Sequence, residues 1–185
     1  MHKSLITAIS SLAAIALLSI TNVHAATYNF TFQSSGAGLT ATGQFTVDAT
    51  DQVTGVSGVV SGPVDQTISA VIANPGFPSP SYSPDGLFIY DNVYHQIGMP
   101  FDVDGLLFVT AQNPSGYWNL WGNSPGNYSL YESAGGSFPI QENGTLSVTP
   151  VPEMSTWAML ATGLAGLGLV GRRRQRPARL APSLG

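Results

Sequence analysis

The chain has 185 residues, of which 43% are hydrophobic and only 9% are charged. Disordered chains combine low hydrophobicity with high net charge, so this composition predicts a folded protein. No Lys or Arg lies between Lys3 and Arg172, whereas nine of the ten acidic residues lie between Asp48 and Glu142, which gives this region a charge of about −9. Phosphate binding needs basic side chains, so nucleic-acid binding is excluded.

The absence of cysteine excludes a disulfide framework, a thiol nucleophile and a cysteine-ligated metal. Glycine (21 residues) and proline (13 residues) are abundant, and Thr, Ser, Val, Tyr and Phe lie between them. This composition is typical of short strands separated by turns. We therefore expect an all-β domain of ordinary size.

The N-terminus has the three parts of a secretory signal peptide. Lys3 precedes an apolar stretch at residues 5–20, and Val23 and Ala25 supply the small residues of a cleavage site. The apolar stretch is short for a permanent membrane span. We expect residues 1–25 to form a signal-peptide helix that is removed on export.

Strand periodicity begins directly after this segment. Tyr28, Phe30 and Phe32 alternate with polar residues, and residues 39–47 continue the same period after the glycine-rich turn at 34–38, which predicts an antiparallel hairpin. The further strands predicted by alternation and turn residues are 53–60, 64–72, 87–97, 106–111, 117–121, 128–132 and 145–149.

The spacing of these strands indicates the fold class. About nine short strands predict an antiparallel β-sandwich or a flattened barrel for residues 26–150. The stretch 74–86 contains four prolines and is expected to be a surface loop.

Catalytic signatures are weak in this domain. His95 with Asp91 nearby is the material for a Ser-His-Asp site, but the surrounding "DNVYHQI" has the pattern of an ordinary strand and no nucleophile motif accompanies it. Glu132 and Glu142 are the natural pair for a glycosidase, although nothing in the sequence fixes their separation. We expect no enzyme activity and no cofactor.

The segment "FDVDG" places Asp102 and Asp104 on one face of an extended chain beside a glycine. Carboxylate oxygens at such a turn suit Ca²⁺, and Asp85 and Asp91 are further donors in the neighbourhood. The full calcium-loop signature is missing, so an Asp-Gly turn that opens a strand is the preferred interpretation and no metal is expected.

The segment "GYWNLW" is the most aromatic part of the chain. In a strand Tyr117, Asn119 and Trp121 share one face while Trp118 takes the other. Tyr117, Trp118 and Trp121 are therefore candidates for a platform that stacks on sugar rings, with packing in the domain's own core as the alternative.

The C-terminus combines an apolar stretch with a basic tail. Residues 155–171 carry no charge and are expected to form a transmembrane helix. Arg172, Arg173 and Arg174 begin a basic tail at 172–185, which the positive-inside rule keeps in the cytoplasm.

The residues ahead of this span extend the pattern. Val151, Pro152, Glu153 and Ser155, within the motif 151–156, precede the span and the arginines in the order of a known signal. Residues 151–185 thus resemble the PEP-CTERM sorting signal of Gram-negative bacteria, with Met154 in place of the family's usual second proline. The resemblance covers the sorting signal, and the domain at 26–150 is similar to uncharacterised β-rich domains found on such proteins.

The resemblance implies that an exosortase recognises this motif, cuts near it and passes the exported domain to the cell surface or the extracellular polysaccharide matrix. The expected partners are the exosortase, the membrane through the C-terminal helix and exopolysaccharide. The expected function is a structural or adhesive one at the cell surface or in the matrix, transiently or permanently anchored in the inner membrane. The alternative is a carbohydrate-binding module that uses Tyr117, Trp118 and Trp121.

Overall fold

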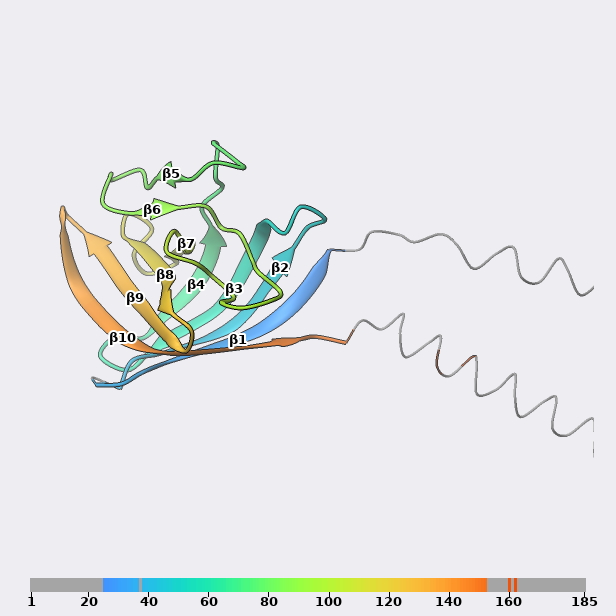
Figure 1. Cartoon of the computed structure of the whole chain (residues 1–185). Coiled ribbons are helices and arrows are strands. Elements are labelled where there is room, and N and C mark those ends of the chain that lie inside the picture. Colours follow the sequence, from blue (N-terminus) through green and yellow to red (C-terminus); the bar gives the residue numbers. More distant parts are fainter. Residues whose placement is uncertain (1–24, 37, 153–159, 161, 163–185) are drawn as a thin grey trace, which may run out of the picture. The chain divides into compact units, whose positions relative to one another are not determined.

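The structure, a computed structural model of the whole chain, describes residues 25–36, 38–152, 160 and 162. Eight strands close into an antiparallel barrel in which neighbours in the sheet follow the order β1-β10-β9-β8-β7-β4-β3-β2 (Figure 1). The strands of the barrel are β1 (Ala26–Ser34), β2 (Thr40–Val47), β3 (Val53–Ser61), β4 (Gln66–Val71), β7 (Leu106–Thr110), β8 (Tyr117–Ser124), β9 (Asn127–Ala134) and β10 (Ser137–Pro150).

The barrel form of the predicted fold is confirmed, and the sandwich form is not. A sandwich has two separate sheets, whereas here the first and last strands, β1 and β10, are neighbours and close a single sheet. The last strand is longer than predicted. β10 was predicted only at residues 145–149, but its first half, which contains Phe138 and Ile140 among polar residues, is paired with β9 from Ser137 onward.

Alternation along the strands fills the interior of the barrel. Phe30 and Phe32 of β1 face Ala41 and Phe45 of β2 inside the barrel, as the sequence pattern predicted. An eight-stranded barrel is just wide enough for side chains to fill it. The buried residues of this inner core are Phe30, Phe32, Leu39, Ala41, Phe45, Val47, Val53, Val56, Val60, Ile68, Tyr94, Phe101, Leu106, Phe108, Trp118, Leu120, Tyr128 and Leu130.

Two facing glycines allow strands β2 and β3 to approach closely. Gly43 and Gly58 are partners in the register of this pair. A Cβ on Gly43 would lie 2.0 Å from the carbonyl oxygen of Ser57, and a Cβ on Gly58 would lie 2.1 Å from that of Thr42. No side chain fits in either place, so the wall of the barrel requires glycine here.

The predicted strand at residues 87–97 is wrong. The only strand here is Ile89–Tyr90 (β6), whose partner Ser81–Tyr82 (β5) lies inside the predicted loop, while Val93 forms an isolated bridge with Gln52. β6 ends at Tyr90, and Asn92 beyond it has a left-handed φ of 58°. The Asn92 side chain donates to the carbonyl oxygen of Ile72 and accepts from the backbone N–H of Leu107, so it ties two elements together instead of continuing a ladder.

Residues 72–105, here called the strap, connect β4 to β7. Their first part packs on the outside of the barrel, where Figure 1 shows β5 and β6 next to β7 and β8, whereas Tyr94 and Phe101 of the later part belong to the inner core. It creates a second apolar cluster beyond the inner core. The buried members are Phe88, Tyr90 and Leu107, and the partly buried members are Ile72, Tyr117, Trp121, Tyr131 and Phe138.

The sequence-predicted terminal segments lie almost entirely outside the described residues. This holds for the signal peptide at 1–25, the helix at 155–171 and the tail at 172–185, of which only Ala25, Leu160 and Thr162 are described. Of the sorting motif, Val151 and Pro152 are described and follow β10, whereas Glu153 and Ser155 are not. In the part of the chain that the structure describes, no helix is long and apolar enough to cross a membrane.

Candidate ligand-binding pocket on the outer wall

Strand β8 directs its aromatic residues to both sides of the barrel wall, as the alternation predicted. Trp118 points inward and is 0% exposed, stacked on Phe108 with its Nε1 donating to Oε1 of Gln66 at 3.3 Å. Trp118 therefore cannot belong to a sugar-binding surface, and its place in the predicted platform is corrected. Tyr117 and Trp121 point outward, where they are half-buried under the strap.

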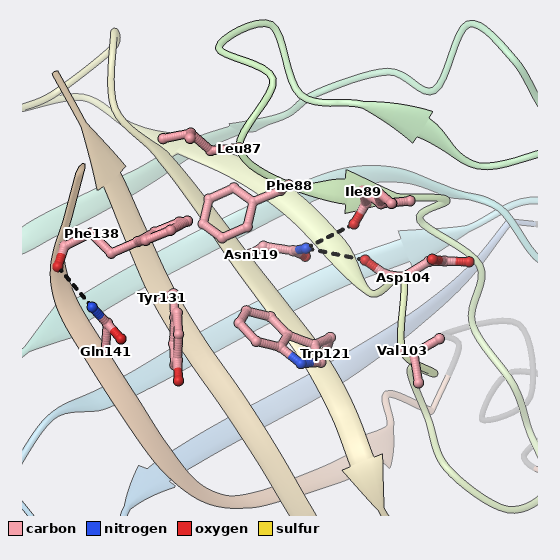
Figure 2. Close-up of a pocket in the computed structure, with 10 residues that line it drawn as sticks. All are labelled: Leu87, Phe88, Ile89, Val103, Asp104, Asn119, Trp121, Tyr131, Phe138 and Gln141. Carbon is pink, nitrogen blue, oxygen red and sulfur yellow. Dashed lines mark hydrogen bonds between the residues drawn. The ribbon is translucent and has the colours of Figure 1, made fainter. Parts of the chain in front are cut away.

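A pocket of about 540 Å³ lies on this outer face, between the strap and the wall of the barrel. Figure 2 shows its lining residues converging from β8, β9, β10 and the strap. They are Leu87, Phe88, Ile89, Val103, Asp104, Asn119, Trp121, Tyr131, Phe138 and Gln141. Of the three aromatic residues predicted for sugar binding, the pocket contains Trp121.

Four aromatic rings from four different elements form the apolar part of the pocket. Trp121 and Tyr131 meet edge to face with ring centroids 4.7 Å apart, and Phe88 and Phe138 lie 5.3 Å apart. Phe88 also lies 6.2 Å from Trp121, which links the two pairs. Tilted and edge-to-face arrangements of this kind fix the rings relative to one another. The rings thus form a rigid aromatic surface.

Asn119 is the main polar group at the base of the pocket. Its residue is only 2% exposed, and its Nδ2 donates to the carbonyl oxygens of Ile89 and Asp104, each at 3.1 Å (Figure 2). Its Oδ1 is buried and accepts no hydrogen bond from any described residue. Buried polar atoms in proteins are rarely left without a partner, so this oxygen marks a place where a donor fits.

The strap is held over the barrel by Asp85. The Ser133 hydroxyl of β9 donates to Oδ2 of Asp85, while the Ser83 hydroxyl and the backbone N–H of Leu87 donate to its Oδ1. Burial raises the pKa of Asp85, but these hydrogen bonds outweigh burial and hold it below its ordinary value. The strap residues that roof the pocket, Leu87 and Phe88, follow directly.

Asp91, Asp102 and Asp104 meet at the foot of the strap, where one oxygen of each lies within 4.8 Å of the others. Asp91 is 7% exposed, and burial, together with the charges of the other two, raises its pKa to about 6. Burial and Asp102 also raise the pKa of Asp104. Of the two further donors that the sequence suggested, the structure places Asp91 beside Asp102 and Asp104, whereas Asp85 lies elsewhere. Such an acidic cluster alone does not show an ion, and the calcium hypothesis is still only a prediction.

His95 lies in a loop and not in the predicted strand. Its Nε2 is 3.7 Å from Oδ2 of Asp102, and no hydrogen bond joins its side chain to a serine within the described residues. The structure therefore does not assemble the Ser-His-Asp arrangement around His95 and Asp91 that the sequence left open.

Glu132 and Glu142 lie on neighbouring strands. Glu132 is buried inside the barrel, where its Oε1 accepts from Asn113 Nδ2 at 3.0 Å and from Gln66 Nε2 at 3.4 Å. Glu142 of β10 is paired with Leu130, two residues from Glu132 along β9, and is half-buried. Neither residue lines the outer pocket. The hydrogen bonds from the Asn113 and Gln66 side chains indicate that Glu132 has a structural role.

Of the ten residues that line the pocket, sequence reasoning named only Trp121 and Asp104 as site candidates, and the eight that it missed include Phe88, Asn119, Phe138 and Gln141. Asn119 was placed on the correct face, but nothing in the sequence showed that the strap would cover that face. Phe88 was assigned to a strand that does not form, and Phe138 and Gln141 lie in the half of β10 that was not predicted. The one available signal was a polar Asn between Trp118 and Leu120 in an otherwise apolar strand.

Comparison with known proteins does not add to this description. No family model, no curated protein and no solved structure matches the chain. The geometry of the barrel and its pocket is therefore the basis for the proposals below.

Proposed function

We propose that the chain is an exported protein that is displayed at the cell surface or in the extracellular polysaccharide matrix, where its barrel has an adhesive or structural role without catalysis. The observation that carries this proposal is the pocket on the outer wall. It offers four aromatic rings in mutual contact and one acceptor that has no partner among the described residues, and none of the described residues that line it is a histidine, serine or threonine. These are the features of a binding site rather than of a nucleophilic catalytic site.

The localisation of the protein is part of the proposal. The signal-like segment at 1–25 directs export, and the segment at 151–185 holds Pro152 and Glu153 at the outer face of the inner membrane for an exosortase. Proline keeps this motif extended and outside the following helix. Met154 removes a second proline, so processing is expected to be slower than with a Pro-Glu-Pro motif.

Fractionation tests this localisation. The full chain is expressed in a host with an exosortase and in the same host without it, and the intact mass is measured in the inner-membrane, surface and matrix fractions. We expect a form that ends near Pro152 or Glu153 in the surface or matrix fraction only when the exosortase is present. Met154→Pro should increase the processed share, and Pro152→Ala should reduce it, whereas Pro150→Ala at the end of β10 serves as the matched control.

A full-length tail in the inner membrane of both hosts would contradict exosortase sorting. The adhesive role has a separate readout, which is retention of the protein in washed extracellular polysaccharide. Release of all protein by a buffer wash would contradict adhesion. The alternative function, a carbohydrate-binding module, is favoured by Trp121 in the pocket, although the buried Trp118 takes no part in it.

A further inference from the structure

We propose that the outer-wall pocket binds an uncharged pyranose unit of a polysaccharide, with its ring face on Trp121 and one of its hydroxyl groups donating to Oδ1 of Asn119. This inference rests on the proposed adhesive function and names the ligand class of the site. It goes beyond the predicted surface platform, because the site is a pocket formed by two layers of the fold.

The buried acceptor selects the ligand. Oδ1 of Asn119 has no donor among the described residues, and its Nδ2 is already engaged by the carbonyl oxygens of Ile89 and Asp104. The Asn119 side chain is therefore held in place by these two bonds, as Figure 2 shows, and its Oδ1 remains as a buried acceptor on a residue that lines the pocket. A purely aliphatic ligand would leave this oxygen buried and unpaired, whereas a ligand with a hydroxyl group would satisfy it.

The rings select a ligand with a flat, weakly polar face. Trp121 and Tyr131 meet edge to face at 67°, so they form a corner rather than a single plane, and Phe88 and Phe138 continue the apolar lining. One face of a pyranose ring presents C–H groups that can contact an aromatic ring while its hydroxyl groups point sideways. The pocket volume of about 540 Å³ lies within the range of small-ligand sites and leaves room for more than one such unit.

Charge excludes acidic sugars. No Lys or Arg lies between Lys3 and Arg172, so no strand or loop of the barrel supplies a cation to a carboxylate, sulfate or phosphate. Asp104 lines the pocket, and Asp91 and Asp102 lie next to it. An anionic ligand would meet this negative potential without a partner, so acidic sugars do not fit. The apolar side chains and neutral amides that form most of the lining favour an uncharged sugar.

Gln141 provides a second polar contact at the rim. Its Nε2 donates to the carbonyl oxygen of Phe138 at 3.2 Å, and the residue is exposed. Because this bond lies at the surface, the amide can exchange it for a sugar hydroxyl at little cost. Asn119 at the base and Gln141 at the rim therefore give a bound ring two polar contacts on different sides of the aromatic corner.

The test is calorimetric titration of the purified full chain with three sets of oligosaccharides: neutral glucose, galactose and mannose oligomers, a uronic-acid oligomer and a glucosamine oligomer. We expect binding of at least one neutral oligomer and no binding of the uronic-acid oligomer. Trp121→Ala should lower the affinity for the neutral oligomer about tenfold or more. Tyr82→Ala is the matched control, since Tyr82 is an aromatic residue of the strap that is 70% exposed and does not line the pocket.

The role of Asn119 is tested by changing the sugar and not the protein, so that the fold is not disturbed. The sugar hydroxyl groups are replaced one at a time by hydrogen or by fluorine. At one position both replacements should weaken binding about tenfold, because neither hydrogen nor fluorine can donate a hydrogen bond to Oδ1. Thermal unfolding of each variant confirms that Trp121→Ala and Tyr82→Ala remain folded at the titration temperature.

The outcomes separate this inference from the proposed function. Neutral-sugar binding that Trp121→Ala leaves unchanged, or binding of only the charged oligomers, would overturn the inference. So would the absence of all neutral-sugar binding while the protein is still retained in the washed matrix, and in that case the adhesive function would stand. If the matrix retention is also absent, both proposals fail.

Discussion

At the scale of single residues, Asn119 and Asp91 show how burial gives ordinary side chains unusual properties. Both are almost fully buried between the strap and the barrel. Asn119 has its two N–H groups bonded to main-chain carbonyls and its oxygen free, so its chemistry is that of an acceptor. Asp91 has one oxygen bonded to the backbone N–H of Val93 and lies beside two further carboxylates.

The raised pKa of Asp91 predicts that the stability of the protein depends on pH. Burial is the main cause that raises its pKa from 3.8 to about 6; the hydrogen bond from the Val93 N–H opposes this rise, and the charges of Asp102 and Asp104 add to it. Because the folded-state pKa lies above the unfolded value, the stabilising contribution is complete below about pH 4 and is lost as the pH rises through 6. Asp91→Asn should therefore unfold at a higher temperature than the wild type at pH 7, by an amount equivalent to roughly 2 kcal/mol.

Thermal unfolding from pH 4 to 7 measures this effect. The difference between Asp91→Asn and the wild type should grow over that interval, and Asp65→Asn, on the exposed turn before β4, should show no such trend. A variant that is less stable than the wild type at pH 7 would contradict the prediction. That result would mean that a bound group compensates the charge of Asp91, and it would favour the calcium hypothesis.

Gly43 gives a second prediction at this scale. Gly43→Ala places a Cβ 2.0 Å from the Ser57 carbonyl oxygen and 2.9 Å from Cα of Gly58, and both are main-chain atoms that cannot rotate away. We expect a loss of about 1–3 kcal/mol in the free energy of unfolding, measured by urea denaturation. Gly55→Ala in the same strand pair is the control, because its Cβ would meet only Oγ1 of Thr46 at 3.9 Å. Equal stability of the two variants would show that the strands can separate here.

At the scale of elements, the strap decides where a ligand can bind. Without it, the outer face of β7, β8 and β9 would be a curved apolar surface, and with it that face becomes a lined pocket. The strap has little regular structure of its own, since β5 and β6 have two residues each. It is held to the barrel by side chains, chiefly those of Asp85 and Asn92 in its middle part, and by main-chain hydrogen bonds such as that from Val53 N–H to the carbonyl oxygen of Asn92.

Ser133→Ala tests this attachment. The variant removes the hydroxyl that donates to Oδ2 of Asp85, while the Ser83 hydroxyl and the Leu87 N–H still bond to Oδ1. We expect about 1–2 kcal/mol of destabilisation and faster amide hydrogen exchange in residues 83–89, with little change in β1–β3. Ser137→Ala, which removes an exposed hydroxyl bond to the Ala134 carbonyl oxygen, is the control. Unchanged exchange in the strap would show that Asp85 does not hold it.

At the scale of the whole molecule, closure and charge set the behaviour of the barrel. Each of the eight strands has a neighbour on both sides, so the barrel presents no open edge for pairing with another chain. The barrel region carries a charge of about −9 with no basic side chain. Both features suit a domain that is displayed among other molecules and binds through one local site.

The charge predicts how salt acts on ligand binding. Association that depends on ion pairs weakens steeply with salt, whereas binding through rings and neutral hydrogen bonds does not. The dissociation constant for a neutral oligosaccharide should therefore change by less than about twofold between 50 and 500 mM NaCl, measured by the same calorimetric titration. A tenfold weakening would contradict the uncharged character of the site.

The sequence by itself determined most of the barrel strands and their inward faces. Alternation of apolar and polar residues is a local property, so Phe30, Phe32 and Phe45 could be assigned to the core and Trp118 and Trp121 to opposite faces before any pairing was known. The absence of cysteine likewise excluded disulfides. The expected localisation of the protein also rests on the sequence alone, through the terminal segments at 1–25 and 151–185.

Only the tertiary structure decided that the sheet closes into a barrel, that residues 137–144 belong to its last strand, and that the strap covers the outer face of β8. The physical reason is that these features depend on contacts between segments distant in sequence. Burial of Asn119 needs Ile89 and Asp104, and the acidic cluster needs Asp91 beside Asp102. The local pattern around each of these residues is that of an ordinary strand or turn, so the site exists only once the strap has packed on the barrel.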